Sequence, residues 1–308
     1  MRPIIIYGPT ALGKSNLAIE IAKLRPSTII SMDSVMHYRG FDIGSAKPSL
    51  EERQRFPHHL IDHISLPEVY TVADFVNDVK RIISAETMKQ RQPIIVGGTL
   101  LYLNALLYGH NQDAPEVNLT THQSILETIK NQTQEERYNE LMRIDPDWAE
   151  KINKNDSQRT IRGLMVYHVH QKTLSSYHRS QKNECNTNEY TLVALTTSDR
   201  QYLRDKVKIR IDNMFNAGLE EEFETLRCQY SEFLSHPAFK SIGYKQFVES
   251  DATDSIPVQE KIFFATSQFA KRQFTWMKKF TPNITIELDK NNEKKIRQNA
   301  YSILEYNS

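Results

Sequence analysis

The chain has 308 residues, and its 25% charged and 39% hydrophobic residues are typical of a globular protein rather than a disordered or fibrous one. Because 39 Lys and Arg residues are balanced by 38 Asp and Glu residues, the net charge is only +1. This excludes a uniformly basic nucleic-acid-binding protein, so any RNA-binding surface must be a local patch.

The two cysteines, Cys185 and Cys228, lie far apart and belong to no spacing typical of a zinc module or a disulfide framework. Such cysteine usage fits the reducing cytosol, and we expect a cytoplasmic protein. The N-terminal apolar run, Ile4 to Tyr7, is too short for a signal sequence or a membrane span. We therefore expect no membrane association.

Strand-like and helix-like segments alternate in the first hundred residues. Residues 3–7 and 28–32 are β-branched apolar runs, and a helix is expected from about Lys14, with Leu17, Ile21 and Leu24 on one face, to Arg25-Pro26. A second helix, from about Val72 to Lys89, precedes a third apolar run over residues 93–96. This order predicts a parallel α/β sheet, whose ligands bind at the carboxyl ends of its strands. Gly8, Asp33 and Thr99 fall there.

The character of the sequence changes between Ala114 and Glu189, where polar helix-compatible stretches replace strand-like runs. Residues 190–197 then resemble a strand that returns to the sheet, and the rest is expected to be chiefly helical. We expect a core domain of residues 1–114 and 190–308 and a helical insertion of residues 115–189.

A phosphate-binding loop is predicted between the first strand and the first helix, where the sequence satisfies G-x-x-x-x-G-K-[ST]. In this arrangement backbone N–H groups and the helix N-terminus face an anion, the lysine adds a point charge, and the last hydroxyl reaches a phosphate-bound metal. The residues concerned are Gly8, Pro9, Thr10, Ala11, Leu12, Gly13, Lys14 and Ser15.

The loop alone leaves the reaction open. A nucleoside-triphosphate enzyme normally has a carboxylate after an apolar strand, whereas the third strand here ends in Gly97-Gly98-Thr99. Asp33, which follows the second strand, remains available as a metal ligand or as a base. An ATP-binding nucleotide kinase is the general alternative at this point.

Further motifs follow one another along nearly the whole chain: Asp33-Ser34, GSAKP at residues 44–48, PHHLID at 57–62, GGTLLY at 97–102, NDSQR at 155–159, KSIGYK at 240–245 and KRQFTWMK at 271–278. With these motifs in this order, the chain closely resembles the tRNA dimethylallyltransferases. The resemblance implies a fold like that of the P-loop NTPases, with a parallel sheet flanked by helices and a helical insertion domain. It also implies transfer of a dimethylallyl group from dimethylallyl diphosphate, with Mg²⁺, to N6 of the adenosine 3′ of the tRNA anticodon.

Carried over by motif, Asp33 is the general base, and Thr10, Lys14, Ser15, Thr99 and Arg210 surround the diphosphate, with Ser15 toward the metal. The residues themselves allow other roles. Asp33 is also suited to cap the next turn, and Thr99 to cap the next helix. Arg210 lies in an apolar helical stripe with Val207, Ile211 and Met214, so it needs an anionic partner, which a carboxylate of Glu220-Glu221-Glu222 would also supply.

The RNA surface is expected from basic residues interleaved with aromatic ones, which suits phosphates and unpaired bases. Lys279 and Phe280 extend the pattern at 271–278, and the whole stretch is expected to be helical. The target base must leave its stack to enter the site. The expected tRNA-binding residues are Asp33, Ser34, Val35, Met36, Gln158, Arg159, Thr160, Ile161, Arg162, Lys240, Ser241, Ile242, Gly243, Tyr244, Lys245, Lys271, Arg272, Gln273, Phe274, Thr275, Trp276, Met277 and Lys278.

Two enzymatic alternatives remain besides a monomeric tRNA-modifying enzyme: a nucleotide kinase, which turns over ATP and ignores tRNA, and an isopentenyltransferase that acts on free adenine nucleotides. A nonenzymatic RNA-binding switch would leave Lys14 and Asp33 without a task. His58, His59 and His63 do not have the spacing of a helical metal-binding pair, so we expect no metal there.

Overall fold

The structure is a computed structural model that describes residues 1–109, 117, 122–180, 186–251, 255–292 and 295–307. By its internal contacts the chain divides into two units, one formed by Met1–Leu106 with Asn186–Ser308 and the other by Leu107–Cys185. Each unit contains its own cluster of buried apolar side chains. Among the described residues, no helix combines the length and the apolar character needed to cross a membrane.

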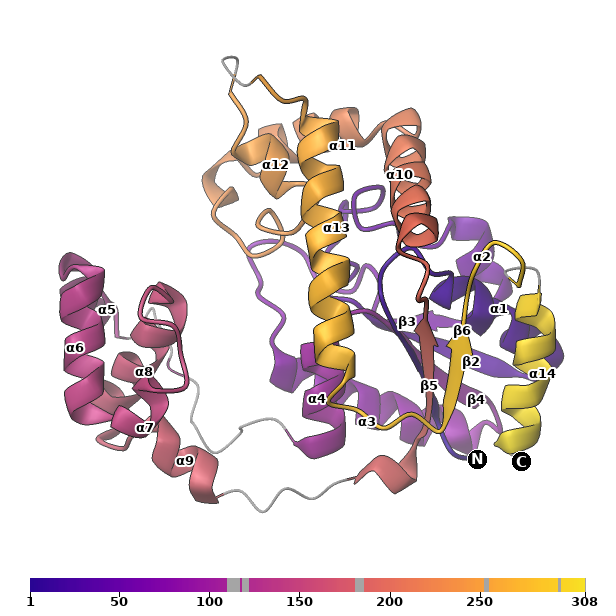
Figure 1. Cartoon of the computed structure of the whole chain (residues 1–308), viewed down its shortest axis with the longest axis horizontal. Coiled ribbons are helices and arrows are strands. Elements are labelled where there is room, and N and C mark those ends of the chain that lie inside the picture. Colours follow the sequence, from indigo (N-terminus) through magenta and orange to yellow (C-terminus); the bar gives the residue numbers. More distant parts are fainter. Residues whose placement is uncertain (110–116, 118–121, 181–185, 252–254, 293–294, 308) are drawn as a thin grey trace. The chain divides into compact units, whose positions relative to one another are not determined.

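The first unit is built on a six-stranded sheet with the strand order β3-β2-β4-β1-β5-β6. Figure 1 shows two of its adjacent strands, β5 and β6, side by side. All the neighbouring strands pair in parallel, as the alternation of apolar runs and helices predicted. Its central strands are nearly continuous apolar runs because helices cover both faces of such a sheet. The strands are β1 (Ile4–Tyr7), β2 (Ser27–Met32), β3 (His58–His59), β4 (Gln92–Gly97), β5 (Thr191–Thr196) and β6 (Ile284–Glu287).

Helices flank the sheet. On one side, Leu17 of α1 and Ile303 of α14 pack against alternate residues of β1, Ile4 and Ile6. Elsewhere α3 contacts β4, and Phe75 of α3 stacks on Tyr102 of α4 with 4.4 Å between ring centroids. The helices of this unit are α1 (Lys14–Leu24), α2 (Leu50–Arg55), α3 (Val72–Met88), α4 (Leu100–Tyr108), α10 (Arg200–Asn216), α11 (Leu219–Gln229), α12 (Lys245–Val248), α13 (Val258–Met277) and α14 (Ile296–Tyr306), with the 3₁₀ turns η1 (Asn186–Glu189) and η2 (Ser231–Phe233).

Local signals explain where the first helices begin and end. Helix α1 follows Gly13, whose φ of 74° is in the left-handed region, and it ends before Arg25, which is extended because Pro26 follows. Helix α3 begins with a capping box, in which the Thr71 side chain accepts from the Asp74 N–H and the Asp74 side chain accepts from the Thr71 N–H. Both helices lie where the sequence predicted them.

The second unit is a small helical body, formed by α5 (Gln123–Asn131), α6 (Gln134–Ile144), α7 (Pro146–Ala149), α8 (Ser157–His170) and α9 (Leu174–Ser180). Its core gathers Leu141 of α6 and Leu164 of α8, and Gly163 allows their close approach because an added Cβ would lie 2.8 Å from Leu141 Cδ1. Buried Asp145 ties two helix starts together, since its carboxylate accepts the N–H groups of Trp148 and Ser175.

The chain after β5 is chiefly helical, as expected, but Ile284–Glu287 forms an additional strand, β6, at the edge of the sheet. This strand has only four residues with short alternation, which is too little for a clear sequence signal. The basic helix ends at Met277 instead of continuing to Phe280, and Phe280 is buried with its ring edge on Tyr7 at 5.8 Å.

A carboxylate of α11 holds the segment after β2 in place. Glu222 accepts the backbone N–H groups of Asp42, Ile43 and Gly44 at 3.0, 2.7 and 3.1 Å, and the Tyr244 hydroxyl at 2.7 Å. Gly44 has no room for a side chain, since a Cβ would lie 2.5 Å from the Tyr244 ring. The GSAKP and KSIGYK motifs are therefore joined through one glutamate.

We expect Glu222→Ala to lower the free energy of unfolding by about 3 kcal/mol, because three backbone N–H groups, two of them partly buried, and a buried hydroxyl lose their acceptor. Urea denaturation followed by circular dichroism measures this change. The matched control is Glu220→Ala, since Glu220 is exposed on the same first turn of α11. Equal stability of the two variants would contradict the assigned role of Glu222.

Candidate active site

The predicted phosphate loop connects β1 to α1 at the carboxyl edge of the sheet. Gly8 lies against β5, where an added Cβ would be 2.4 Å from the Leu195 carbonyl oxygen. Ala11 and Gly13 have φ values of 65° and 74°, so the chain turns twice through the left-handed region. The Lys14 ammonium donates to the Pro9 carbonyl at 2.7 Å, which folds the lysine back over its own loop.

The Gly97-Gly98-Thr99 turn follows β4 and lies against the end of β2. At Gly97 an added Cβ would be only 2.0 Å from the Met32 carbonyl oxygen, and the Thr99 N–H donates to the same oxygen at 3.3 Å. Because Asp33 follows Met32 directly, this contact brings the Thr99 turn beside the segment that carries the aspartate. Glycine at position 97 is thus a steric requirement of the site.

One oxygen of Asp33 caps the following turn, as one interpretation of the sequence expected. Oδ1 accepts the backbone N–H groups of Val35 and Met36 at 2.8 and 3.3 Å. Within the described part of the chain, no hydrogen bond reaches Oδ2. The capping role and a catalytic role are therefore compatible, because the cap fixes the carboxylate and leaves one oxygen available.

Lys14, Arg210 and Asp33 lie close enough for their charges to act on one another. Burial, followed by repulsion from Arg210, lowers the pKa of Lys14 to about 7, although Asp33 opposes this shift. Burial also lowers the pKa of Arg210, again opposed by attraction to Asp33. Two cationic groups thus share a single nearby carboxylate, and the site favours an additional anion.

Arg210 lies on α10 among the buried apolar side chains of Val207, Ile211 and Met214, as the helical spacing predicted. The acidic stretch on α11 is not its partner, because the Glu222 carboxylate is occupied by the segment 42–44. The carboxylate that acts on Arg210 is that of Asp33. The guanidinium therefore belongs to the same site as the phosphate loop.

Three hydroxyl groups surround these charges. Thr10 and Ser15 belong to the phosphate loop, and Thr99 precedes α4. None of the three side chains forms a hydrogen bond with another described residue. Thr99 caps the start of α4 with its backbone carbonyl only, which accepts the N–H groups of Tyr102 and Leu103. These hydroxyls are available to a ligand.

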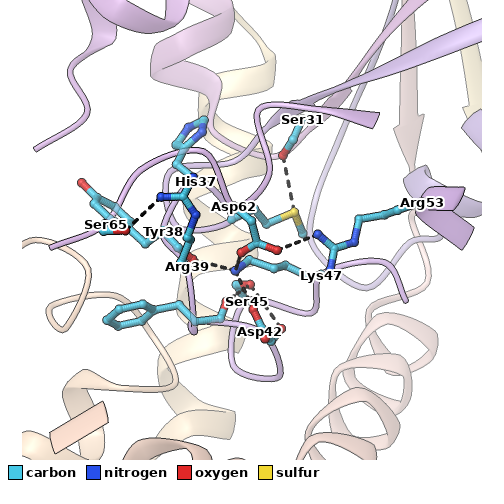
Figure 2. A network of polar contacts seen from close by, with 12 residues as sticks. Ser31, His37, Tyr38, Arg39, Asp42, Ser45, Lys47, Arg53, Asp62 and Ser65 are labelled. Carbon is cyan, nitrogen blue, oxygen red and sulfur yellow. Dashed lines mark hydrogen bonds and ion pairs between the residues drawn. The ribbon is translucent and has the colours of Figure 1, made fainter. Parts of the chain in front are cut away.

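The segment between β2 and α2 is fixed by an ion-pair network around the buried Lys47 side chain, which sequence reasoning did not anticipate (Figure 2). The side chain of Lys47 is only 2% exposed, and its ammonium donates to the Tyr38 carbonyl at 2.6 Å, to Asp42 at 2.6 Å and to Asp62 at 2.5 Å. Arg53 donates to the other Asp62 oxygen at 2.6 Å. Burial alone raises the pKa of Asp62, but the hydrogen bonds from Lys47 and Arg53 outweigh it and lower the pKa.

His37 and His63 belong to an aromatic cluster beside this segment. The His37 ring is fully buried, it lies 4.1 Å from the Tyr70 ring and 5.1 Å from the His63 ring, and its Nδ1 is 3.1 Å from the Leu60 carbonyl oxygen. Burial, with a contribution from His63, lowers the pKa of His37 to about 3. His37 is therefore a neutral core residue that supports the turn after Asp33. No group of three or more metal-ligating side chains occurs among the described residues.

The residues expected to bind tRNA differ in their exposure. The exposed ones are Ser34, Gln158, Arg159, Lys240, Lys245, Lys271, Arg272, Thr275 and Lys278, and most of the others are half-buried. Buried side chains are Thr160, whose hydroxyl donates to the Asp156 carbonyl, Tyr244, whose hydroxyl donates to Glu222, and Gln273. These three residues are therefore corrected to internal roles. Trp276 remains partly exposed, with the Lys279 ammonium 4.1 Å above its ring.

Residues 36–280 match the family model described as IPP transferase; this range covers most of the chain and includes Thr99 and Arg210, whereas the phosphate loop and Asp33 precede it. The chain belongs to the IPP transferase family. It is accordingly a prenyl-transferring enzyme, with the α/β fold that the sequence predicted.

Named relatives agree with this assignment. This IPP transferase is 39% identical over 277 residues to the tRNA dimethylallyltransferase of Neisseria gonorrhoeae, covering 89% of this chain and 88% of the relative. It is 36% identical over 309 residues to that of Hydrogenovibrio crunogenus, covering 98% and 93%.

Solved structures show the same fold. The tRNA delta(2)-isopentenylpyrophosphate transferase of Staphylococcus epidermidis matches 100% of both chains at 29% identity and a TM-score of 0.67. A eukaryotic dimethylallyltransferase that acts on tRNA matches 99% of this chain and 78% of its own at 26% identity and a TM-score of 0.83.

The lowered pKa of Lys14 predicts how binding of the prenyl donor in the absence of an acceptor depends on pH. Above a pH of about 7 the free lysine is neutral, while a bound anion raises its pKa, so binding requires a proton. We expect the dissociation constant to rise by up to about tenfold per pH unit between pH 7.5 and 9. Equilibrium binding measures this, in a range where the donor's own phosphate charge is constant. Lys14→Met should bind weakly without this slope, whereas a flat wild-type profile contradicts the prediction.

Proposed function

We propose that this IPP transferase transfers a dimethylallyl group from dimethylallyl diphosphate to N6 of the adenosine immediately 3′ of the anticodon in tRNA and releases diphosphate. The observation that carries this proposal is the charge balance of the site: among the described carboxylates, Asp33 alone offsets the charges of Lys14 and Arg210. The names of the relatives, tRNA dimethylallyltransferases, supply the class of donor and acceptor.

The phosphate loop is the proposed diphosphate site. Its backbone N–H groups lie at the start of α1, where the helix dipole favours an anion, and Lys14 adds a positive charge. Arg210 faces the same charges from α10, and the free hydroxyls of Thr10 and Thr99 can donate to phosphate oxygens. These groups stabilise the diphosphate most when it leaves, because its negative charge grows as the C–O bond breaks.

Mg²⁺ fits this arrangement only together with the donor. The described residues contain no cluster of carboxylates, histidines and cysteines that would hold a cation alone, and Mg²⁺ is commonly bound through substrate phosphates with one or two protein groups. The Ser15 side chain, exposed at the start of α1, is the proposed protein group. A bound Mg²⁺ neutralises part of the charge on the diphosphate.

Asp33 is the proposed general base. The lone pair of an adenine N6 amine is delocalised into the ring, so the amine becomes a good nucleophile only as it loses a proton. The C–N bond forms at the allylic carbon while the C–O bond to diphosphate breaks, and the N6 proton passes to Oδ2 of Asp33. The backbone N–H groups on Oδ1 hold the carboxylate in position during this step.

The tRNA contacts are proposed for exposed cations. Lys271 and Arg272 lie on the last part of α13 and Lys278 follows it, while Lys240 and Lys245 flank the Gly243-Tyr244 turn. Such side chains neutralise backbone phosphates and position an RNA without reading its sequence. Arg159, exposed in the helical unit, is a further candidate.

A reaction with purified protein, dimethylallyl diphosphate, Mg²⁺ and unmodified tRNA tests the proposal. We expect mass spectrometry of tRNA digests to show one prenyl group on the adenosine next to the anticodon. Asp33→Ala should lower kcat by about 10²–10⁴-fold, because the proton then has no fixed acceptor. Prenylation of free adenine nucleotides but not of tRNA would refute the proposed acceptor, and ATP turnover without prenylation would refute the proposed reaction. An unchanged kcat in Asp33→Ala would refute Asp33 as the general base.

Neutralising Lys271 and Lys278 together to Ala should weaken tRNA binding and flatten its dependence on salt, because fewer counterions are released from the RNA. Filter binding at several salt concentrations measures both effects, and the circular dichroism spectrum should not change. Lys80→Ala is the matched control, an exposed lysine on α3. If the control and the double variant bind alike, these lysines do not contact tRNA.

A further inference from the structure

We propose that Gln273 is a positioning residue for the prenyl donor, which locks the phosphate loop to the Gly97-Gly98-Thr99 turn. This assignment rests on the proposed diphosphate site. It also moves Gln273 from the tRNA side, where its motif placed it, to the donor side of the enzyme.

The Gln273 side chain bridges two loops that are far apart in the sequence. Its Oε1 accepts the backbone N–H of Thr10 at 2.9 Å, and its Nε2 donates to the carbonyl oxygen of Gly98 at 2.9 Å. The residue is only 3% exposed, whereas its neighbours Lys271 and Arg272 on α13 point into solvent. An amide is the side-chain group that can accept from one loop and donate to the other.

The bridge explains why position 98 is glycine. A Cβ there would lie 2.4 Å from Gln273 Nε2, while its next contact outside this side chain, the Gly8 carbonyl oxygen, is at an ordinary 3.6 Å. The backbone of Gly98 has no positive φ that would disfavour alanine. The Gln273 side chain is therefore the main obstacle to a methyl group, and it can move away only by giving up its hydrogen bonds.

The bridge also fixes which loop groups face the donor. The Thr10 N–H is directed to Gln273, so the anion must be held by the later N–H groups of the loop, by Lys14 and by the free hydroxyls of Thr10 and Thr99. Without the bridge, these two loops would have to be ordered by the donor itself, and part of the binding free energy would be lost. Neither of the groups that Gln273 joins, the Thr10 N–H and the Gly98 carbonyl, is proposed to contact tRNA.

Steady-state kinetics of Gln273→Leu, which keeps the volume but removes both hydrogen bonds, test the proposal. We expect the KM for dimethylallyl diphosphate to rise on the order of tenfold, which is about 1.4 kcal/mol, with the KM for tRNA unchanged. Gln273→Glu should not restore donor binding, because a carboxylate cannot donate to the Gly98 carbonyl and adds negative charge near the diphosphate. Gln268→Ala is the matched control, an exposed glutamine on the same helix.

A double-mutant cycle with Gly98→Ala supplies a second test. Gly98→Ala alone should expel the Gln273 side chain and reproduce the donor defect of Gln273→Ala. The KM of the double variant for dimethylallyl diphosphate should be no higher than that of Gln273→Ala, because removal of the amide makes room for the methyl group. The unfolding midpoints of the four proteins should show the same non-additivity, and this readout needs no donor.

The outcomes separate this inference from the function on which it rests. A wild-type enzyme that neither binds nor uses dimethylallyl diphosphate would refute the proposed function, whatever the unfolding cycle shows. With an active wild type, a rise in the KM for tRNA alone would return Gln273 to the RNA surface. If the Gln273 variants are less stable but have unchanged KM and kcat, the role of Gln273 is merely structural. If the effects of the Gly98 and Gln273 substitutions are additive, the side chain of Gln273 does not join the two loops. Each of these results overturns the proposal.

Discussion

The site depends on how closely the carboxyl ends of the parallel strands approach the loops that follow them. Gly97 lies so near the Met32 carbonyl that a Cβ would be 2.0 Å from its oxygen, and Gly8 lies nearly as close to Leu195. These approaches let the phosphate loop, the Asp33 turn and the Thr99 turn meet above β1, β4 and β2. A side chain at either glycine would force neighbouring strands or loops apart and separate the proposed diphosphate site from the proposed base.

The same crowding sets the electrostatics. Lys14 and Arg210 are drawn into surroundings poor in water, where each disfavours the charge of the other, and only Asp33 offsets them. The folded protein tolerates this because glutamate and lysine elsewhere fix the surrounding segments. Glu222 holds residues 42–44, and Lys47 joins the separate segments that carry Tyr38 and Asp62. Stability from these neighbouring networks thus supports a site that is itself short of negative charge.

The sequence predicted the fold wherever a local signal was strong. The runs before Gly8 and Gly97, the helix from about Val72 and the apolar stripe around Arg210 lie as expected. The sequence did not reveal β6, because a four-residue strand has too short a pattern to be recognised. It also placed Gln273 and Tyr244 on a basic surface, because the tertiary contacts that bury them come from distant parts of the chain. The Lys47–Asp62 and Glu222 networks were also missed, because a charged residue shows its partner only when the fold brings the two together.

The protonation state of Lys14 has a thermodynamic consequence for calorimetry. Near neutrality the empty enzyme is a mixture of molecules with and without an ammonium at position 14. When an anion binds, the enzyme molecules in which Lys14 is neutral take up a proton from the buffer. The apparent enthalpy of association should therefore differ between buffers of unlike ionisation heat, and the difference reports how many enzyme molecules were uncharged at that position before the donor arrived.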